Sequence, residues 1–115
     1  QAVGDPVELA GVRLEPANYL ATYKGRQLDL GPVEFKLLNF FIANPDRVYT
    51  RDQILDQVWG GDRYVQDRTV DVYIRRVRAT LEEVGAPELI QTVRGVGYRC
   101  YGKAGNADVS GQRAG

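Results

Sequence analysis

The stretch that decides the fold is residues 67–81, which read "DRTVDVYIRRVRATL". An α-helix turns about 100° per residue, so this stretch separates into two faces. One face is an aliphatic stripe that predicts burial, and it consists of Val70, Ile74, Val77 and Leu81, with Tyr73 beside it. The other face carries arginines around small apolar side chains, and it consists of Arg68, Val72, Arg75, Arg76 and Ala79, with Arg78 at the border. The pattern predicts an amphipathic helix that Asp67 caps and that ends near Glu83.

The arginine face is unusual because the chain as a whole is neutral, with 15 basic and 15 acidic side chains among 115 residues. Residues 1–62 carry six basic and nine acidic side chains, whereas residues 63–115 carry nine and six. Five of the basic residues lie between Arg63 and Arg78. A solvated face with ordinary salt bridges is one interpretation of such a run. A surface for a polyanion such as nucleic acid is the other.

The residue types present exclude several classes of function. The chain has no histidine, which excludes a histidine general base, a Ser-His-Asp triad and a histidine metal site. Cys100 is the single cysteine, so no internal disulfide or thiolate cluster can form, as is typical of a reducing compartment. No paired-carboxylate, phosphate-loop or complete dinucleotide-binding motif is present, so we expect neither an enzyme nor a cofactor. No apolar run approaches the roughly 18 residues of a membrane span, so we expect a cytoplasmic protein without a membrane partner.

The segments around the basic helix complete the predicted fold. Residues 7–30 alternate weakly between apolar and polar, which predicts three or four short antiparallel strands. Residues 32–43 predict a helix that is apolar nearly all round and therefore buried between two layers. Thr50 and Gln53 form a capping-box pair before a second, short helix. Residues 89–102 alternate again around two glycines, which predicts a hairpin. Strands, three helices and a hairpin in this order make an α+β domain.

The basic helix and the hairpin together suit duplex DNA. An α-helix fits the major groove, where the guanidinium group of arginine pairs with O6 and N7 of guanine. Val72 is small enough to contact a thymine methyl group, and arginines at the flanks of the helix reach phosphates. A narrow hairpin that carries Arg94 near its tip can enter a minor groove. Three helices followed by such a hairpin predict a winged helix-turn-helix.

Four stretches resemble the C-terminal effector domain of OmpR/PhoB-family response regulators: "LGPVEFKLLNFF", "NPDRVYTRDQILDQVWG", "DRTVDVYIRRVRATLE" and "QTVRGVGYR". The resemblance spans roughly residues 7–101 and is strongest to the branch that regulates the phosphate regulon. It implies a four-stranded N-terminal sheet, a three-helix winged-helix core and a C-terminal hairpin. It also implies sequence-specific binding to double-stranded promoter DNA and activation of transcription, as a head-to-tail dimer on direct repeats that recruits RNA polymerase.

The resemblance further implies a phosphorylatable receiver domain, which a sensor histidine kinase controls. The chain begins at Gln1 rather than Met, and we expect it to be a piece of a longer protein from which that receiver domain is absent. We expect residues 1–6 to be the remains of a linker, residues 7–102 to be the DNA-binding domain, and residues 103–115 to be a flexible tail.

Site residues follow from the resemblance by position. On the basic helix, the positions that contact DNA are Arg68, Thr69, Tyr73, Arg75, Arg76 and Arg78. We expect Arg76 to contact a base and the others to contact phosphates. The hairpin positions are Thr92, Arg94 and Tyr98, with Arg94 toward the minor groove. Trp59 corresponds to a position that contacts the DNA backbone, although a buried core tryptophan explains it as well. Related sequences often carry histidine in place of Tyr73, which leaves the base preference there open.

The connector between the second and third helices matches the transactivation loop of the family, which meets the sigma subunit of RNA polymerase. It consists of Gly60, Gly61, Asp62, Arg63, Tyr64, Val65, Gln66 and Asp67. A plain link between two helices explains the same residues. A winged-helix module that binds protein or RNA stays open as an alternative function, and it predicts binding to duplex DNA that is weak or indifferent to sequence.

Overall fold

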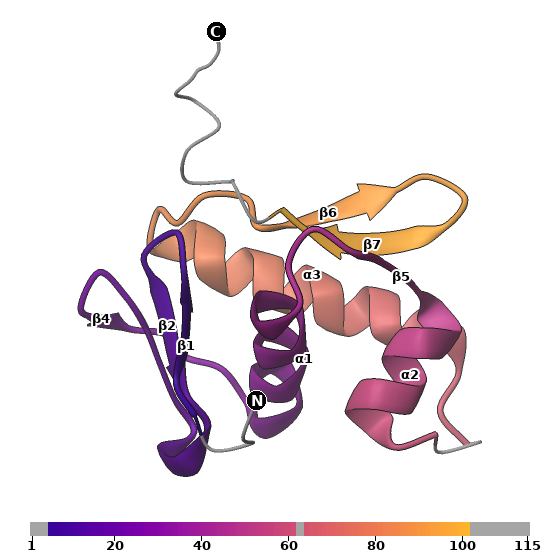
Figure 1. Ribbon diagram of the computed structural model, residues 1–115, viewed down its shortest axis with the longest axis horizontal. Coiled ribbons are helices and arrows are strands. Elements are labelled where there is room, and N and C mark those ends of the chain that lie inside the picture. The colour runs from indigo at the N-terminus through magenta and orange to yellow at the C-terminus, as the bar shows by residue number, and fades with distance from the viewer. Residues whose placement is uncertain (1–4, 62–63, 102–115) are drawn as a thin grey trace, which may run out of the picture.

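The computed structural model describes residues 5–61 and 64–101, and Figure 1 shows its elements along the chain. The first four strands are β1 (Val7–Leu9), β2 (Val12–Glu15), β3 (Leu20–Tyr23) and β4 (Arg26–Gln27). They form one antiparallel sheet in the order β1-β2-β3-β4, which confirms the strands that the alternation predicts. A 3-10 turn, η1 (Pro16–Asn18), joins β2 to β3. Buried Val12 and Leu14 alternate with exposed Arg13, so one face of the sheet covers the core and the other faces solvent.

Helix α1 (Pro32–Ala43) lies between the N-terminal sheet and the other helices (Figure 1). It begins at Pro32, where the missing N–H leaves no hydrogen bond unmade. The buried side chains of α1 are Phe35, Leu37, Leu38, Phe41 and Ile42, and they point to more than one side of the helix. The helix contacts β1, α2, α3 and one strand of the C-terminal hairpin. This placement confirms that α1 is buried between two layers.

Helix α2 (Arg51–Trp59) begins with the predicted capping box. The N–H group of Thr50 donates to Gln53 Oε1 at 2.9 Å, and the N–H group of Gln53 donates to Thr50 Oγ1 at 3.1 Å. Two donors that would otherwise be unpaired at the start of the helix are thereby satisfied. The helix ends at Gly60, whose φ of +68° lies in the left-handed region that favours glycine.

Helix α3 (Asp67–Glu83) has the two faces that the sequence predicts. Its buried residues are Val70, Ile74, Val77 and Leu81, which confirms the aliphatic stripe. The predicted cap is wrong by one position, because Gln66 is the N-cap and Asp67 is the first helical residue, with no hydrogen bond from a capping side chain. Asp67 still stabilises the helix, since its negative charge lies near the positive end of the helix dipole.

The C-terminal hairpin belongs to a three-stranded sheet that the sequence predicts only in part. The hairpin strands are β6 (Ile90–Val93) and β7 (Gly97–Cys100), and β5 (Val48–Thr50) pairs with β7 to give the order β5-β7-β6. We call the β6–β7 hairpin the wing. Strand β5 was missed because its three residues are too few for alternation to show. Gly97 lies opposite Thr50, where a Cβ atom would collide with the carbonyl oxygen of Tyr49.

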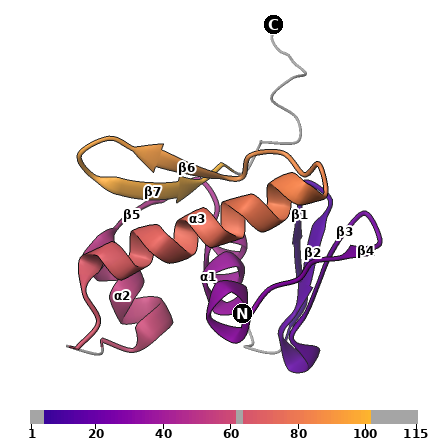
Figure 2. The same ribbon diagram turned by 180° about the vertical axis from the view of Figure 1, so that it is seen from behind.

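These elements leave α3 on the outside of the molecule. Figure 2, the view from behind, shows α3 crossing in front of α1 with the wing above it. The order of elements and the wing after the third helix make a winged helix-turn-helix, which confirms the predicted fold class. None of the helices in residues 5–61 and 64–101 has the length and apolar character to span a membrane.

Candidate nucleic-acid interface

Figure 2 shows α3 at the front of the molecule. Between Arg68 and Ala79, the outer side of this helix is exposed and predominantly basic. We call it the α3 face, and its exposed residues are Arg68, Val72, Arg75, Arg76 and Ala79. Val72 is 39% exposed, although valine is a residue type that is commonly buried. The α3 face therefore presents cationic side chains around two small apolar ones. Base edges and thymine methyl groups in the major groove are complementary to such a surface.

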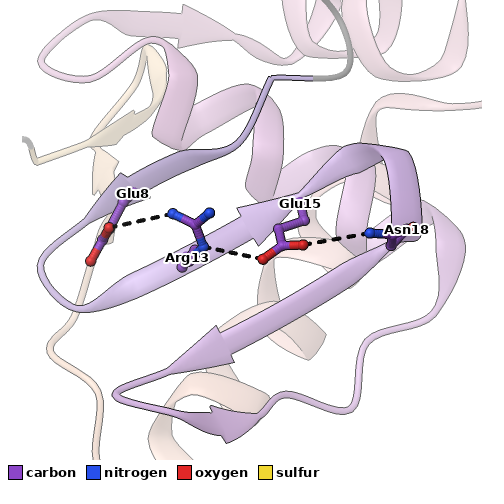
Figure 3. Close-up of polar contacts among 4 residues, drawn as sticks. All are labelled: Glu8, Arg13, Glu15 and Asn18. Carbon is purple, nitrogen blue, oxygen red and sulfur yellow. Dashed lines mark hydrogen bonds and ion pairs between the residues drawn. The ribbon is translucent and has the colours of Figure 1, made fainter.

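Arg13 on the N-terminal sheet illustrates an arginine that carboxylates neutralise. Its Nη1 lies 3.8 Å from Glu8 and its Nε lies 3.2 Å from Glu15 (Figure 3). The side-chain amide of Asn18 donates to the same Glu15 at 3.5 Å. Glu8, Arg13 and Glu15 thus form an ordinary salt-bridged surface. A surface of this kind was one interpretation of the basic residues between Arg63 and Arg78.

The arginines of the α3 face are paired much less. Within the residues that the structure describes, Arg75 forms no ion pair, and Arg68 donates to the uncharged side chain of Gln66 at 3.1 Å. Arg76 lies 3.9 Å from Glu34 on α1, and its guanidinium group lies 4.8 Å from the ring centre of Tyr73. The side chain of Arg76 is 57% exposed and that of Glu34 is 18% exposed, so the ion pair is long and partly screened by solvent. Ordinary salt bridging explains Arg76 in part and leaves the other two arginines unexplained.

One flank of α3 packs on α2 through two aromatic rings. Tyr73 is half-buried, and its ring meets the ring of Trp59 edge to face with centres 5.6 Å apart. Trp59 is also half-buried and packs against the core, and Thr69 is half-buried near the start of α3. Trp59 therefore combines features of both interpretations, since one part of its side chain is covered and the other part reaches the surface beside the α3 face.

The other flank of α3 is joined to the wing by Arg78. The Nε and Nη2 atoms of Arg78 donate to the carbonyl oxygen of Ile90 at 3.0 and 2.8 Å. Nη2 also donates to Thr92 Oγ1 at 3.0 Å, and the guanidinium group lies 5.6 Å from the ring centre of Tyr98. Arg78 and Thr92, both predicted to contact DNA, thus contact each other and fasten β6 to α3.

Asp71 joins α3 to two further elements. Its Oδ1 atom accepts hydrogen bonds from Arg51 Nε at 2.8 Å and from the hydroxyl group of Tyr98 at 2.5 Å. Arg51 is the first residue of α2, where a positive charge is unfavourable unless a carboxylate lies near. Tyr98 on β7 is only 6% exposed, so its side chain is directed into the protein. We call Arg51, Asp71 and Tyr98 the Asp71 cluster.

The hydrogen bonds of the Asp71 cluster change the acid–base properties of its members. Burial raises the pKa of the Asp71 carboxyl, but the hydrogen bonds from Arg51 and Tyr98 and the positive charges of Arg51 and Arg75 together outweigh burial and hold that pKa below its ordinary value of 3.8. Burial, together with the hydrogen bond to Asp71, raises the pKa of the Tyr98 hydroxyl above 10.0. The hydrogen bond to Asp71 raises the pKa of Arg51 as well. At neutral pH the cluster therefore consists of a carboxylate, a guanidinium ion and a neutral phenol.

We expect Asp71→Asn to make the free energy of unfolding of the domain less dependent on pH in the acid range. A carboxyl group with a lowered pKa in the folded state stabilises the fold fully above its unfolded-state pKa, near 3.8. That contribution is lost as the pH falls through the lower, folded-state pKa, whereas asparagine does not titrate. The difference in free energy of unfolding between wild type and variant should therefore shrink as the pH falls from about 6 to about 2, as urea unfolding would measure. A difference independent of pH would show that Arg51 and Tyr98 do not stabilise this carboxylate.

The wing ends in an exposed turn that carries Arg94. The turn is closed by a hydrogen bond from the N–H group of Val96 to the carbonyl oxygen of Val93 at 2.9 Å. Gly95 has a φ of +76° with nothing within 4 Å of a Cβ position, so its backbone conformation and not the available space favours glycine. Val96 is 49% exposed. The tip thus carries one basic and one small apolar side chain on a narrow ribbon.

The loop between α2 and α3 is described in part. Gly60 and Gly61 both have positive φ and end α2. Tyr64 is 89% exposed, whereas Val65 is half-buried and packs against the core. Two predicted residues of this loop, Asp62 and Arg63, lie outside the described residues, as do residues 1–4 and 102–115.

Arg51, Asp71 and Glu34 were not identified from the sequence as part of this surface. Asp71 is 20 residues from Arg51 and 27 residues from Tyr98, and no periodicity links positions that far apart. The only available signal was an acidic residue inside an otherwise basic helix face.

Comparison with known proteins identifies the family. Residues 25–100 match the family described as "Transcriptional regulatory protein, C terminal", a span that contains all three helices and the whole wing. The chain is 51% identical over 98 residues to the phosphate regulon transcriptional regulatory protein PhoB of Klebsiella pneumoniae. That alignment covers 85% of this chain and 43% of the relative, so the chain spans less than half of the curated relative's length.

Two solved structures have the same fold. One is the DNA-binding domain of the response regulator AdeR in complex with an intercistronic region, with a TM-score of 0.72, 30% identity, and coverage of 79% of this chain and 94% of that chain. The other is the Klebsiella pneumoniae RstA DNA-binding domain in complex with an RstA box, with a TM-score of 0.73, 26% identity, and coverage of 84% and 97%. These relatives are transcriptional regulators and not enzymes, as the sequence predicts. Because the family match includes both the helices and the wing, the chain belongs to the C-terminal DNA-binding domains of OmpR/PhoB-type response regulators.

Proposed function

We propose that this domain recognises a specific sequence in double-stranded promoter DNA, with α3 in the major groove and the tip of the wing in an adjacent minor groove. The observation that carries the proposal is the α3 face, where arginines surround Val72 and Ala79 and two of those arginines form no ion pair within the described residues. The AdeR and RstA structures support it, since each of those domains is in complex with a DNA region.

Each residue of the surface has a role in the proposal. Arg76 contacts a base, and Val72 contacts a thymine methyl group. The phosphate contacts come from Arg68, Thr69, Tyr73, Arg75 and Arg78, with Trp59 beside the DNA backbone next to Tyr73. Arg94 enters the minor groove and Thr92 lies along its edge. Tyr98 makes no phosphate contact in this proposal, because its hydroxyl group donates to Asp71 inside the protein.

The proposal extends to the longer protein of which this domain is a part. A cytoplasmic regulator of this type binds direct repeats as a head-to-tail dimer and activates phosphate-regulon promoters, and its receiver domain responds to a sensor histidine kinase. The loop at residues 60–67 meets the sigma subunit of RNA polymerase, and the exposed ring of Tyr64 supports that role. The 51% identity to a phosphate regulon regulator supports the choice of promoters. The boundaries at residues 7 and 102 stay a prediction.

A gel-shift experiment tests the proposal against the alternative of a protein- or RNA-binding module. The wild-type domain first enriches a preferred site from a randomised duplex library, and that duplex is called the selected duplex below. We expect the domain to bind the selected duplex at least about a thousandfold more tightly than a scrambled duplex, as specific DNA-binding proteins do. Equal affinity for both duplexes, or a failure to enrich any sequence, would favour the alternative.

Replacing Arg75 with alanine should weaken binding to every sequence alike. Arg75 is exposed and forms no ion pair in the described part of the chain, so its charge is available to a phosphate. Loss of one phosphate contact should reduce the slope of log affinity against log salt by about one unit. Titrations of the selected and scrambled duplexes at several salt concentrations measure that slope. Arg26→Ala on β4 removes an exposed charge remote from α3 and should retain the wild-type slope. A wild-type slope in Arg75→Ala would show that Arg75 touches no phosphate.

A further inference from the structure

We propose that Tyr98 is a positioning residue: through its hydrogen bond to Asp71 it fixes the wing at the angle to α3 that delivers Arg94 to the minor groove. The inference rests on the proposed function, and it assigns Tyr98 to the positioning of the wing and not to contact with the DNA. It also makes Asp71 and Arg51, which carry no expected DNA contact, part of the recognition surface.

Each strand of the hairpin has one polar attachment to α3. Strand β6 is held by Arg78, which donates to the carbonyl oxygen of Ile90 and to Thr92 Oγ1. Strand β7 is held by Tyr98, whose hydroxyl group donates to Asp71 at 2.5 Å. Thr92 and Tyr98 are direct partners in the β6–β7 pairing, so the two attachments lie at the same level of the hairpin. Strand β5 already pairs with β7 on its other side, and the two attachments to α3 add a fixed orientation of the hairpin relative to that helix.

Tyr98 lies close to the tip of the wing. After the Tyr98–Thr92 pair, the Val93–Gly97 pair is the last in the hairpin, and the turn with Arg94 follows at once. The attachment of β7 therefore lies close to the side chain that it would orient. A small rotation of the hairpin would move Arg94 by a correspondingly small distance, yet groove contacts demand close placement of a guanidinium group.

The Asp71 carboxylate, which accepts the hydrogen bond from Tyr98, is itself held in place. Arg51 donates to the same Oδ1 atom of Asp71 at 2.8 Å, and its guanidinium group lies 5.9 Å from the ring centre of Tyr98. Asp71 thus receives hydrogen bonds from the first turn of α2 and from β7 while it belongs to α3. A carboxylate fixed from two sides has little freedom to follow a moving wing, which makes it a rigid anchor.

Tyr98→Phe tests this role with the least disturbance. The substitution deletes the hydroxyl group alone and changes no charge, and the ring remains between Arg51 and Arg78. Arg78 still holds β6, so we expect the variant to fold. Tyr49→Phe is the matched control, because Tyr49 lies opposite Tyr98 in the β5–β7 pairing, and its hydroxyl group forms no hydrogen bond to another described residue.

The experiment is a double-mutant cycle in DNA affinity between Tyr98→Phe and Arg94→Ala, measured on the selected duplex. We expect Tyr98→Phe to weaken binding by about threefold or more in the wild-type background. In the Arg94→Ala background the same substitution should have almost no effect, because the group that the hydrogen bond positions is gone. Tyr49→Phe should leave affinity at the wild-type level in both backgrounds. Urea unfolding of each variant confirms that every titration uses folded protein.

The possible results separate the inference from the proposed function. If Arg94→Ala binds as tightly as wild type, the minor-groove contact is wrong and the inference is wrong with it. If Arg94→Ala weakens binding and the effect of Tyr98→Phe adds to it in full, the proposed function stands and the inference is overturned, because the hydroxyl group then acts on the DNA directly or on the whole fold. An unchanged affinity of Tyr98→Phe, or a failure of that variant to fold, also overturns it.

Discussion

Replacing Arg76 with alanine is expected to lower the affinity for the selected duplex by about 1–3 kcal/mol and to relax the preference at one base pair. The guanidinium group of arginine pairs with O6 and N7 of guanine, an arrangement of acceptors that no other base presents in the major groove. Arg76 is 57% exposed, and its ion pair with Glu34 is long, at 3.9 Å. The side chain of Glu34 is only 18% exposed, so water screens the pair in part, and its length limits what is lost when Arg76 turns to a guanine.

Parallel selections from a randomised duplex library measure the effect of Arg76→Ala on sequence preference, and titrations measure its affinity. The control is Arg26→Ala, which removes one exposed charge from β4 and should keep the preference at every position. A uniform loss of affinity in Arg76→Ala, with every base preference retained, would assign Arg76 to a phosphate. Full retention of both would remove it from the interface.

Replacing Gly97 with alanine is expected to destabilise the domain by about 1–3 kcal/mol and to separate β5 from the wing. The added Cβ atom would collide with the carbonyl oxygen of Tyr49 and lie 2.9 Å from the Cα atom of Thr50. Both neighbours belong to the backbone of β5, so no rotation of a side chain can relieve the collision. Strand β7 must move away from β5, and the wing that carries Arg94 moves with it. We therefore expect weaker DNA binding as well.

Hydrogen exchange at the amides of β5 and β7, together with urea unfolding, measures the effect of Gly97→Ala. Gly95→Ala is the control at the other end of the same turn. An alanine at that position has open space but must adopt a φ of +76°, which costs about 1–2 kcal/mol of backbone strain and leaves β5 in place. Loss of protection in β5 should therefore occur in Gly97→Ala alone. Wild-type protection of β5 in Gly97→Ala would contradict the close approach of the two strands.

The helices were predictable because residues close together in the sequence indicate where each helix lies. The spacing of Val70, Ile74 and Val77 predicts the buried side of α3, and all three are buried. Thr50 and Gln53 predict the start of α2 through hydrogen bonds between residues three apart, which the structure contains. Interactions between residues three or four positions apart can be recognised directly in the sequence.

The contacts that hold the wing were not predictable in the same way. Strand β5 is only three residues long, and it is stable because β7 lies beside it. Asp71 reads as an acidic residue among the arginines of α3, but its partners come from α2 and from β7. Periodicity assigns a residue to a face of its own element, and it does not specify which residue from another element meets it there.

Arg78 and Tyr98 show the same limit for inference from a family resemblance. The resemblance implies that both lie along the DNA, and the structure places both where the wing meets α3. Arg78 donates three hydrogen bonds to Ile90 and Thr92 through Nε and Nη2, which leaves Nη1 to reach a phosphate. Tyr98 is 6% exposed, and its hydroxyl group donates to Asp71. Position in a motif locates a residue near the interface, whereas its hydrogen bonds decide whether it is available to the ligand.

The proposed placement of α3 in the major groove of duplex DNA can be tested by methylation interference on the selected duplex. Methylation at N7 of guanine blocks the major groove, whereas methylation at N3 of adenine blocks the minor groove. We expect N7 methylation of at least one guanine within the site to abolish binding. We expect N3 methylation of adenine to interfere only next to that part of the site, where Arg94 enters the minor groove. Binding that tolerates N7 methylation of every guanine in the site would contradict the account.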